Sequence, residues 1–170
     1  IQNFLQNTFT APLFPIDFKN FPANTIYSDF NAGDVIQLSN KIKIDTCALN
    51  HPNGAIGYRA NYNGKSACYV TDTEHKIGEV DQNISTLIRE TDLFIYDSTF
   101  TDVSYLQHKG WGHSTWQEGV RLSKESNVGR TAIFHHDPAH DDNSMQEIEK
   151  QTKQMDDHIF IARQGQKIIL

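Results

Sequence analysis

Apolar and polar positions alternate along residues 41–71, which is the pattern of β-strands that bury one face. Three segments share this alternation and are rich in β-branched and aromatic side chains: 41–49, 55–62 and 66–71. Asn63 and Gly64 separate the second segment from the third, and this pair is a strong signal for a tight hairpin turn. The first half of the periodic region is therefore predicted to be antiparallel.

The pattern changes after residue 80. Three segments have the spacing of amphipathic helices: 82–90, 114–127 and 144–155. Ser114–Gln117 or Thr115–Glu118 fits a capping box at the start of the second helix, and Ser144–Glu147 fits one at the third. Three short runs that are apolar on both faces alternate with the helices: 93–96, 131–134 and 158–163. This order predicts an α/β fold in which helices cover a sheet.

The chain is predicted to divide into an irregular lead-in over residues 1–34 and one periodic domain over residues 35–170. The lead-in contains several prolines and opens with a short helix over residues 1–7. A length of 170 residues fits one domain. No apolar run approaches the length of a membrane-spanning helix, so we expect no membrane span.

Charge and cysteine content narrow the class of protein. The formal net charge of −6 argues against a broad basic surface for extended nucleic acid, although it leaves room for a nucleotide-sized site. Cys47 and Cys68 lie in strand-like runs without CxxC spacing, so we expect two small buried side chains rather than a thiolate metal site. A reduced pair of this kind is typical of a cytoplasmic protein.

A histidine or aspartate follows four of the apolar runs, at the point where each predicted strand ends. These residues are His51, Asp72, Asp97 and His135. Any one of them alone would more often be a turn former or a polar cap. Four together at the ligand-binding edge of an α/β sheet favour a metal site instead, because imidazole nitrogen and carboxylate oxygen suit zinc and other first-row ions.

Five motifs occur in an order and spacing that resembles the C-terminal half of a metallo-β-lactamase-fold hydrolase. They are HPNGAIGYR (51–59), YVTDTEH (69–75), IYDSTF (95–100), GWGHSTWQEGVRLSKESNVGR (110–130) and FHHDPAHDD (134–142). The similar branch is that of the tRNA 3′-end-processing ribonucleases and related phosphodiesterases, and the resemblance covers about residues 40–170. It implies an αββα sandwich of which this chain is the C-terminal half, a mixed sheet with covering helices.

The resemblance assigns metal-binding roles to three residues. His51 matches the family's isolated histidine ligand, Asp72 matches the aspartate that bridges two metals, and His135 matches the last histidine ligand. His136 is the alternative to His135 in a neighbouring register. Two zinc ions per complete site are implied, and the same ligand types also suit manganese or iron. Such ions supply a nucleophile and polarise a phosphoryl oxygen.

The resemblance assigns catalytic roles to Asp97 and His113. In the ribonuclease branch, an acid and a non-ligand histidine at these positions form a pair that helps to protonate the leaving group. That branch usually has a glutamate where this chain has Asp97, and the shorter side chain reduces the reach of the pair.

The family's leading H-x-H-x-D-H motif has no match in this chain. A half-fold without it would expose the inner face of its sheet, so we expect that face to be covered by an N-terminal half of the fold or by a second copy of the chain. Alone, the three inferred ligands would hold at most one metal.

The leading hypothesis is thus a metal-dependent hydrolase that acts on a nucleotide or another small phosphodiester. The alternative is a binding or sensing module that keeps the half-fold without turnover. A thioester, lactam or lactone substrate is a third possibility, which the GHST and DSTF motifs disfavour.

The roles of three further residues near the motifs are open: His75, Asp137 and His140. They either line the substrate pocket, orient the metal ligands, or are solvated loop residues. Core packing is the favoured role of Trp111 and Trp116, although the glycines beside Trp111 leave exposure open.

Overall fold

The computed structural model describes all 170 residues, which form two compact units, residues 1–31 and residues 32–170. The first unit contains the helix α1 (Gln2–Thr8), close to the helix predicted over residues 1–7, and the short 3-10 helix η1 (Phe18–Asn20). Aromatic rings pack together in this unit: the ring of Phe9 lies 5.0 Å from that of Phe14 and 5.5 Å from that of Phe21.

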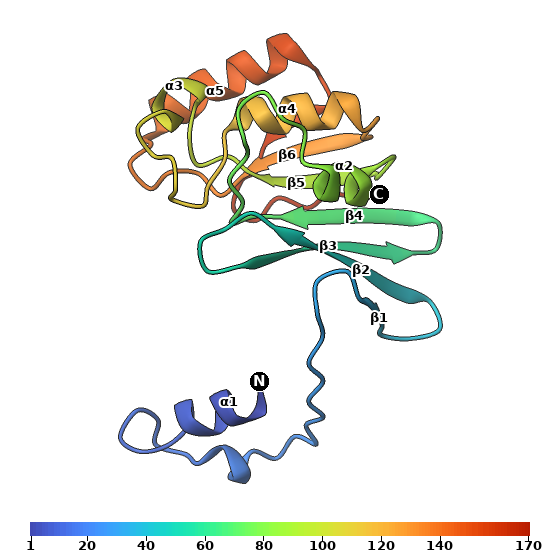
Figure 1. Cartoon of the computed structure of the whole chain (residues 1–170), viewed down its shortest axis with the longest axis vertical. Coiled ribbons are helices and arrows are strands. Elements are labelled where there is room, and N and C mark those ends of the chain that lie inside the picture. The colour runs from blue at the N-terminus through green and yellow to red at the C-terminus, as the bar shows by residue number, and fades with distance from the viewer. The chain divides into compact units, whose positions relative to one another are not determined.

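The second unit is built on one seven-stranded sheet in which the strands follow one another in chain order (Figure 1). The strands are β1 (Val35–Gln37), β2 (Ile42–Leu49), β3 (Ala55–Tyr62), β4 (Lys65–Val70), β5 (Leu93–Asp97), β6 (Arg130–Phe134) and β7 (Ile159–Ile161). Strands β1 to β4 pair antiparallel, whereas β4 to β7 pair parallel. The mixed sheet expected from the sequence is confirmed.

The hairpin between β3 and β4 turns at the predicted pair. Tyr62 pairs with Lys65, and the two residues between them have positive backbone φ angles, 49° at Asn63 and 75° at Gly64. Asparagine and glycine tolerate this left-handed geometry better than other residues, which explains why this pair sets the register of the hairpin.

The helices α2 (Gln82–Ile88), α4 (Trp116–Glu125) and α5 (Asp142–Met155) cover one face of the sheet (Figure 1). Apolar side chains of α2 pack on β2 to β4, and those of α4 and α5 pack on β6 and β7. Cys47 and Cys68 are free and buried beneath α2, as expected, and burial raises the pKa of both thiols to about 11.

The structure corrects two details of the helix prediction. Helix α5 starts at Asp142 because Asp141 caps it by accepting the Ser144 backbone N–H at 2.8 Å, so the capping box predicted at Ser144–Glu147 is wrong. The structure also contains a further helix, α3 (Asp102–Tyr105), whose four residues are too few to produce a periodic pattern. Helix α4 begins after Thr115, whose hydroxyl accepts the Glu118 N–H, in agreement with one of the two predicted caps.

The other face of the sheet carries no helix. Tyr69 on β4 is 43% exposed and Phe134 on β6 is 36% exposed, with ring centres 6.1 Å apart.

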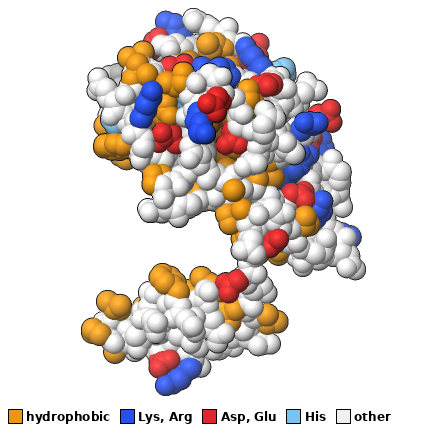
Figure 2. Space-filling view, in the orientation of Figure 1, with side chains coloured by type: hydrophobic (Ala, Val, Ile, Leu, Met, Phe, Trp, Pro, Cys, Tyr) orange, Lys and Arg blue, Asp and Glu red, His pale blue; other side chains and the backbone are white.

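The C-terminal segment is held at β6, because Arg130 Nη2 donates to the Ile169 carbonyl at 2.6 Å. Figure 2 shows further hydrophobic side chains on the surface among charged ones. None of the helices combines the length and the apolar character that crossing a bilayer requires.

Candidate metal centre

The sheet delivers the four residues singled out in the sequence to one edge. Strands β2 and β4 run in the same direction because both pair antiparallel with β3, and β5 and β6 continue parallel to β4. His51, Asp72, Asp97 and His135 therefore all lie at carboxyl ends of strands that point the same way. This convergence was the expectation from the apolar runs, and it follows from the mixed topology.

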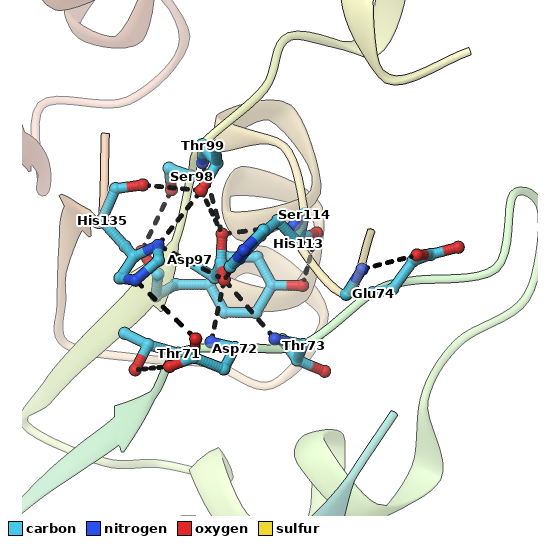
Figure 3. Close-up of polar contacts among 12 residues, drawn as sticks. Thr71, Asp72, Thr73, Glu74, Asp97, Ser98, Thr99, His113, Ser114 and His135 are labelled. Carbon is cyan, nitrogen blue, oxygen red and sulfur yellow. Dashed lines mark hydrogen bonds and ion pairs between the residues drawn. The ribbon is translucent and has the colours of Figure 1, made fainter. Parts of the chain in front are cut away.

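Asp97 is the centre of the polar network at this edge (Figure 3). Its side chain is fully buried. One carboxylate oxygen, Oδ2, accepts the backbone N–H of Asp72 at 2.8 Å and faces His113 Nδ1 at 3.0 Å. The other, Oδ1, accepts the Ser114 N–H at 3.2 Å and the Thr99 hydroxyl at 3.0 Å. Asp97 thus links three separate loops through one carboxylate.

Three side chains at this edge have the chemistry and spacing of a metal site. One ligand atom from each of Asp72, His113 and His135 lies within 4.8 Å of the other two. The imidazole rings of His113 and His135 stack with centres 5.0 Å apart, and His135 Nε2 lies 3.9 Å from Asp72 Oδ1. Two imidazoles and one carboxylate suit zinc and other first-row divalent ions.

Both histidines of this group are oriented through Nδ1. His113 Nδ1 faces Asp97 Oδ2, and His135 Nδ1 lies 3.1 Å from Thr99 Oγ1. A hydrogen bond at one ring nitrogen fixes the tautomer and aims the other, so Nε2 is the nitrogen that each ring offers.

The backbone at two of these residues has a left-handed conformation. The φ angle is 60° at Asp72 and 58° at His135, a region that residues other than glycine adopt infrequently. The Asp72 N–H is held by Asp97, and the carbonyl oxygen of His135 lies 2.8 Å from Thr99 Oγ1. Such strained residues occur preferentially at functional sites, where surrounding contacts maintain them.

His51 is beside this group but is not part of it. Its half-buried ring lies 6.2 Å from that of His113, and its Nδ1 accepts the Asn53 N–H at 3.3 Å. The sequence predicted His51 as a ligand and His113 as a proton donor. The structure places His113 among the three clustered residues. His51 lies outside the cluster, next to the His113 ring.

His135, rather than the alternative His136, points into the group. His136 is not among the clustered residues; it lines a cavity with His135, Phe134 and Arg163, and burial lowers its pKa. Asp137 Oδ1 accepts the Ala139 N–H at 2.8 Å and shapes the loop that follows. His140 is also half-buried in that loop.

Two residues of the network were not anticipated from the sequence. Thr99 contacts both Asp97 and His135, and its position two residues after Asp97 is the spacing of a local side-chain turn. Glu74 binds the loop before His113, accepting the N–H groups of Gly110 and Gly112 at 2.8 and 2.9 Å. No local pattern predicts that long-range contact. Trp116 is in the core as expected, whereas Trp111 is 62% exposed, so core packing is wrong for Trp111.

A buried polar chain lies behind His113. Tyr96 donates its hydroxyl to Ser114 Oγ at 2.8 Å, and Ser114 Oγ lies 2.8 Å from His75 Nδ1. The His75 ring stacks on Tyr105 with ring centres 4.4 Å apart. Burial lowers the pKa of His75 and raises that of Tyr96, so both groups are neutral near pH 7. His75 is therefore a structural support of the Ser114 loop.

Neutral His75 is expected to make the fold less stable in mild acid. Because its pKa in the folded chain is below the ordinary value of 6.5, the unfolded chain binds more protons once the pH falls below that value. Stability from this group is thus present above pH 6.5 and decreases as the pH falls toward the lowered pKa. His75→Asn keeps an acceptor near the Nδ1 position and should flatten this dependence. Urea unfolding midpoints at about pH 7.5 and about pH 5.5 measure it.

The matched control for this experiment is His158→Asn, at an exposed imidazole far along the chain. That variant should keep the pH dependence of the parent chain. An equally steep loss of stability in His75→Asn would contradict the structural role of the neutral ring.

The chain is similar in sequence and structure to several known proteins. Residues 13–136 match the family described as β-lactamase superfamily domain. Ribonuclease Z of Haloferax volcanii is 28% identical over 105 residues, which are 62% of this chain and 32% of that protein. The human tRNase Z short form superposes with a TM-score of 0.55 and 20% identity, over 76% of this chain and 43% of that one.

A diphosphatase of the PhnP family is also similar in structure, with a TM-score of 0.58 and 21% identity over 81% of this chain and 46% of that one. At such identities the two solved structures establish the fold alone. This chain spans about a third of the ribonuclease and less than half of each solved structure.

Proposed function

Because the chain belongs to the β-lactamase superfamily domain family, we propose that it forms part of a metal-dependent hydrolase for a nucleotide or another small phosphodiester. The match and the structural neighbours confirm both the family resemblance and the fold class inferred from the sequence. The observation that carries the proposal is the convergence of Asp72, His113 and His135 above the buried Asp97.

The residues present fit a metal ion. Asp72 offers a half-exposed carboxylate, and His135 is already aimed through its Nδ1 contact with Thr99, as ligands in metal sites usually are. Zinc is the ion proposed, with manganese or iron suited by the same donors. When bound, such ions supply an activated water and stabilise charge on a phosphoryl oxygen.

His113 is proposed to protonate the leaving oxygen. Its Nδ1 lies 3.0 Å from a carboxylate oxygen of Asp97 that can only accept, so Nδ1 carries a hydrogen and Nε2 is the atom that transfers a proton. Asp97 orients the ring and, through the Ser114 N–H, also the loop that carries it. The aspartate in place of the family's usual glutamate therefore still reaches its partner.

The dinuclear site of the family requires ligands beyond those clustered here. We propose that an N-terminal half of the fold, carrying the H-x-H-x-D-H motif, supplies them and covers the helix-free face of the sheet. The partly exposed rings of Tyr69 and Phe134 on that face support this arrangement. A second copy of the chain is the other candidate to cover it. His51, one ring away from His113, is proposed to join the ligands of the completed site.

Phosphodiester substrates are proposed because of the activities for which similar proteins are named. One similar protein is named a ribonuclease, and two similar structures are named a tRNase and a diphosphatase. The net charge of −6 favours a nucleotide or small diester over extended nucleic acid, whose binding depends on many cationic contacts.

Two single variants separate the proposed roles of the histidines. His135→Ala should lower both the zinc bound per chain and the hydrolysis of bis(p-nitrophenyl) phosphate, because it removes a ligand. His113→Ala should leave the bound zinc nearly unchanged while slowing hydrolysis by about 100-fold or more, because it removes only the proton donor. Zinc is measured by mass spectrometry on the metal-loaded protein.

The reverse pattern would reassign the residues. Zinc lost equally in both variants would make His113 a ligand, in line with its place in the cluster. Unchanged hydrolysis by the complete protein in His135→Ala would contradict the proposed function itself.

A non-catalytic binding or sensing role is the second candidate. It is favoured by the small size of the ligand cluster, three residues, in a chain without the H-x-H-x-D-H motif. This candidate predicts metal binding without turnover. Hydrolysis by the chain alone with added Zn²⁺ or Mn²⁺, abolished by a chelator, would rule it out.

A further inference from the structure

The loop before His113 presents an exposed tryptophan next to the candidate centre. Trp111 is 62% exposed, whereas the chain's other tryptophan, Trp116, is 3% exposed. The indole packs beside two other rings. Its centre lies 4.9 Å from that of the perpendicular His108 ring, and the His108 ring stacks on buried Phe100 with centres 4.4 Å apart. The two rings are perpendicular, and the exposure of Trp111 leaves ring surface available to a ligand.

Glu74 fixes the backbone on both sides of this tryptophan. Its carboxylate accepts the Gly110 N–H at 2.8 and 2.9 Å and the Gly112 N–H at 2.9 Å. Figure 3 shows Glu74 directed at this loop, away from Asp97. Hydrogen bonds to a charged acceptor are stronger than neutral ones, so one side chain holds the loop at two points.

The glycines make this arrangement possible. Gly110 and Gly112 have φ angles of 87° and 83°, values that other residues rarely adopt. The Trp111 N–H also donates to the His108 carbonyl at 3.2 Å. With its backbone fixed on both sides, Trp111 loses little conformational freedom when a ligand binds, which is the condition for an effective aromatic contact.

The position of the loop connects Trp111 to the proposed chemistry. One residue separates Trp111 from His113, and the Phe100 ring lies 6.5 Å from the indole and 6.3 Å from the His113 imidazole. The indole and the His113 imidazole therefore both lie near the Phe100 ring, which places the indole in the neighbourhood of the proposed proton donor.

We propose that Trp111 is a stacking subsite for a base-sized aromatic ring on the substrate, and that Glu74 is the positioning residue that holds it. The inference rests on the proposed function and narrows its substrate to diesters that carry a nucleobase or similar ring. A flat indole stacks on any base face, so the subsite selects for a ring without selecting one base.

The test compares adenosine 5′-monophosphate with ribose 5-phosphate, which lacks the base, on the zinc-loaded chain. Calorimetric titration should show about tenfold or greater preference for the nucleotide, the usual scale of one base–aromatic stack. The nucleotide should also quench the emission of exposed Trp111, and ribose 5-phosphate should not. Trp111→Leu should abolish the quench and reduce the preference to about one, while Trp111→Phe keeps part of the preference.

Glu74 is tested through Trp111. Glu74→Gln replaces one acceptor oxygen with a donor and should reduce the nucleotide preference several-fold in the parent chain. In the Trp111→Leu background the same change should alter the preference no further, because its effect acts through the indole. A general structural role would lower the affinity for both ligands in both backgrounds.

The control is Tyr62→Leu, at a half-exposed ring beside the β3–β4 turn, which should keep the full preference. Equal binding of the two ligands to the parent chain, binding of neither, or an undiminished preference in Trp111→Leu would each overturn the subsite. Bis(p-nitrophenyl) phosphate hydrolysis is assayed separately. Its absence in the protein completed by the N-terminal half, alongside a Trp111-dependent preference, would refute the proposed function and leave the subsite standing.

Discussion

Asp97→Asn is expected to slow phosphodiester hydrolysis by about 100- to 10,000-fold and to destabilise the fold by about 1–3 kcal/mol. The carboxylate is fully buried and both of its oxygens accept hydrogen bonds, including the backbone N–H groups of Asp72 and Ser114. An amide places an NH₂ group against at least one of these donors. The variant would therefore leave buried N–H groups without acceptors and release the His113 ring.

Asp92→Asn is the matched control for this variant. Asp92 precedes the strand that Asp97 ends, and it also accepts a backbone N–H, that of Ser66 at 2.8 Å. Its replacement should lower the unfolding midpoint without slowing hydrolysis, because it lies at the opposite end of β5. Urea unfolding and initial rates on the same preparations measure both effects. An Asp97→Asn protein with parental rate and midpoint would disprove the central role of this carboxylate.

Gly112→Ala is expected to be far more damaging than Gly110→Ala, although both glycines have nearly the same φ. A Cβ at Gly112 would lie 2.3 Å from His51 Cδ2 and 2.8 Å from His51 Nε2, whereas a Cβ at Gly110 would meet nothing within 4 Å. Each variant carries the left-handed strain of about 1–2 kcal/mol. Overpacking against His51 should add about 1–3 kcal/mol for Gly112→Ala alone.

Denaturant unfolding of the two variants measures this difference directly. Zinc binding provides a second readout, because displacement of the His51 ring should weaken metal affinity in Gly112→Ala if His51 joins the ligands. Equal destabilisation by the two alanines would show that the His51 ring can move aside at no cost. The loop that carries Gly110 and Gly112 would then not depend on close contact with His51.

The architecture and the edge that carries the site were predictable from local patterns. Apolar runs located strands β2 to β7, and the Asn63–Gly64 pair fixed one hairpin. The histidine or aspartate that ends four of these runs then indicated which edge binds a ligand. These features are short-range, so the sequence contains them in readable form.

Relations between distant residues were not predictable from those patterns. Which of His51 and His113 lies nearer to Asp72 depends on how the glycine loop packs, and that packing depends on Glu74, 38 positions before Gly112. The left-handed backbone at Asp72 and His135 likewise results from contacts with Asp97 and Thr99 rather than from local preference. The family resemblance assigned His51 as a ligand and His113 as a proton donor. The metal content and hydrolysis rates of the His113 and His135 variants test these roles.

The sharing of Asp97 among several loops limits how this protein can be altered, in evolution or by design. Segments that follow β4 and precede α4 are bound to the same two oxygen atoms, so neither can be exchanged for a loop of different length without disturbing the other. New substrate preferences should therefore arise by side-chain changes around Trp111, whose ring lies outside that shared anchor, rather than by loop grafting. In related proteins that share such a carboxylate, the side chains around Trp111 are expected to vary most and the lengths of the loops bound to the carboxylate least.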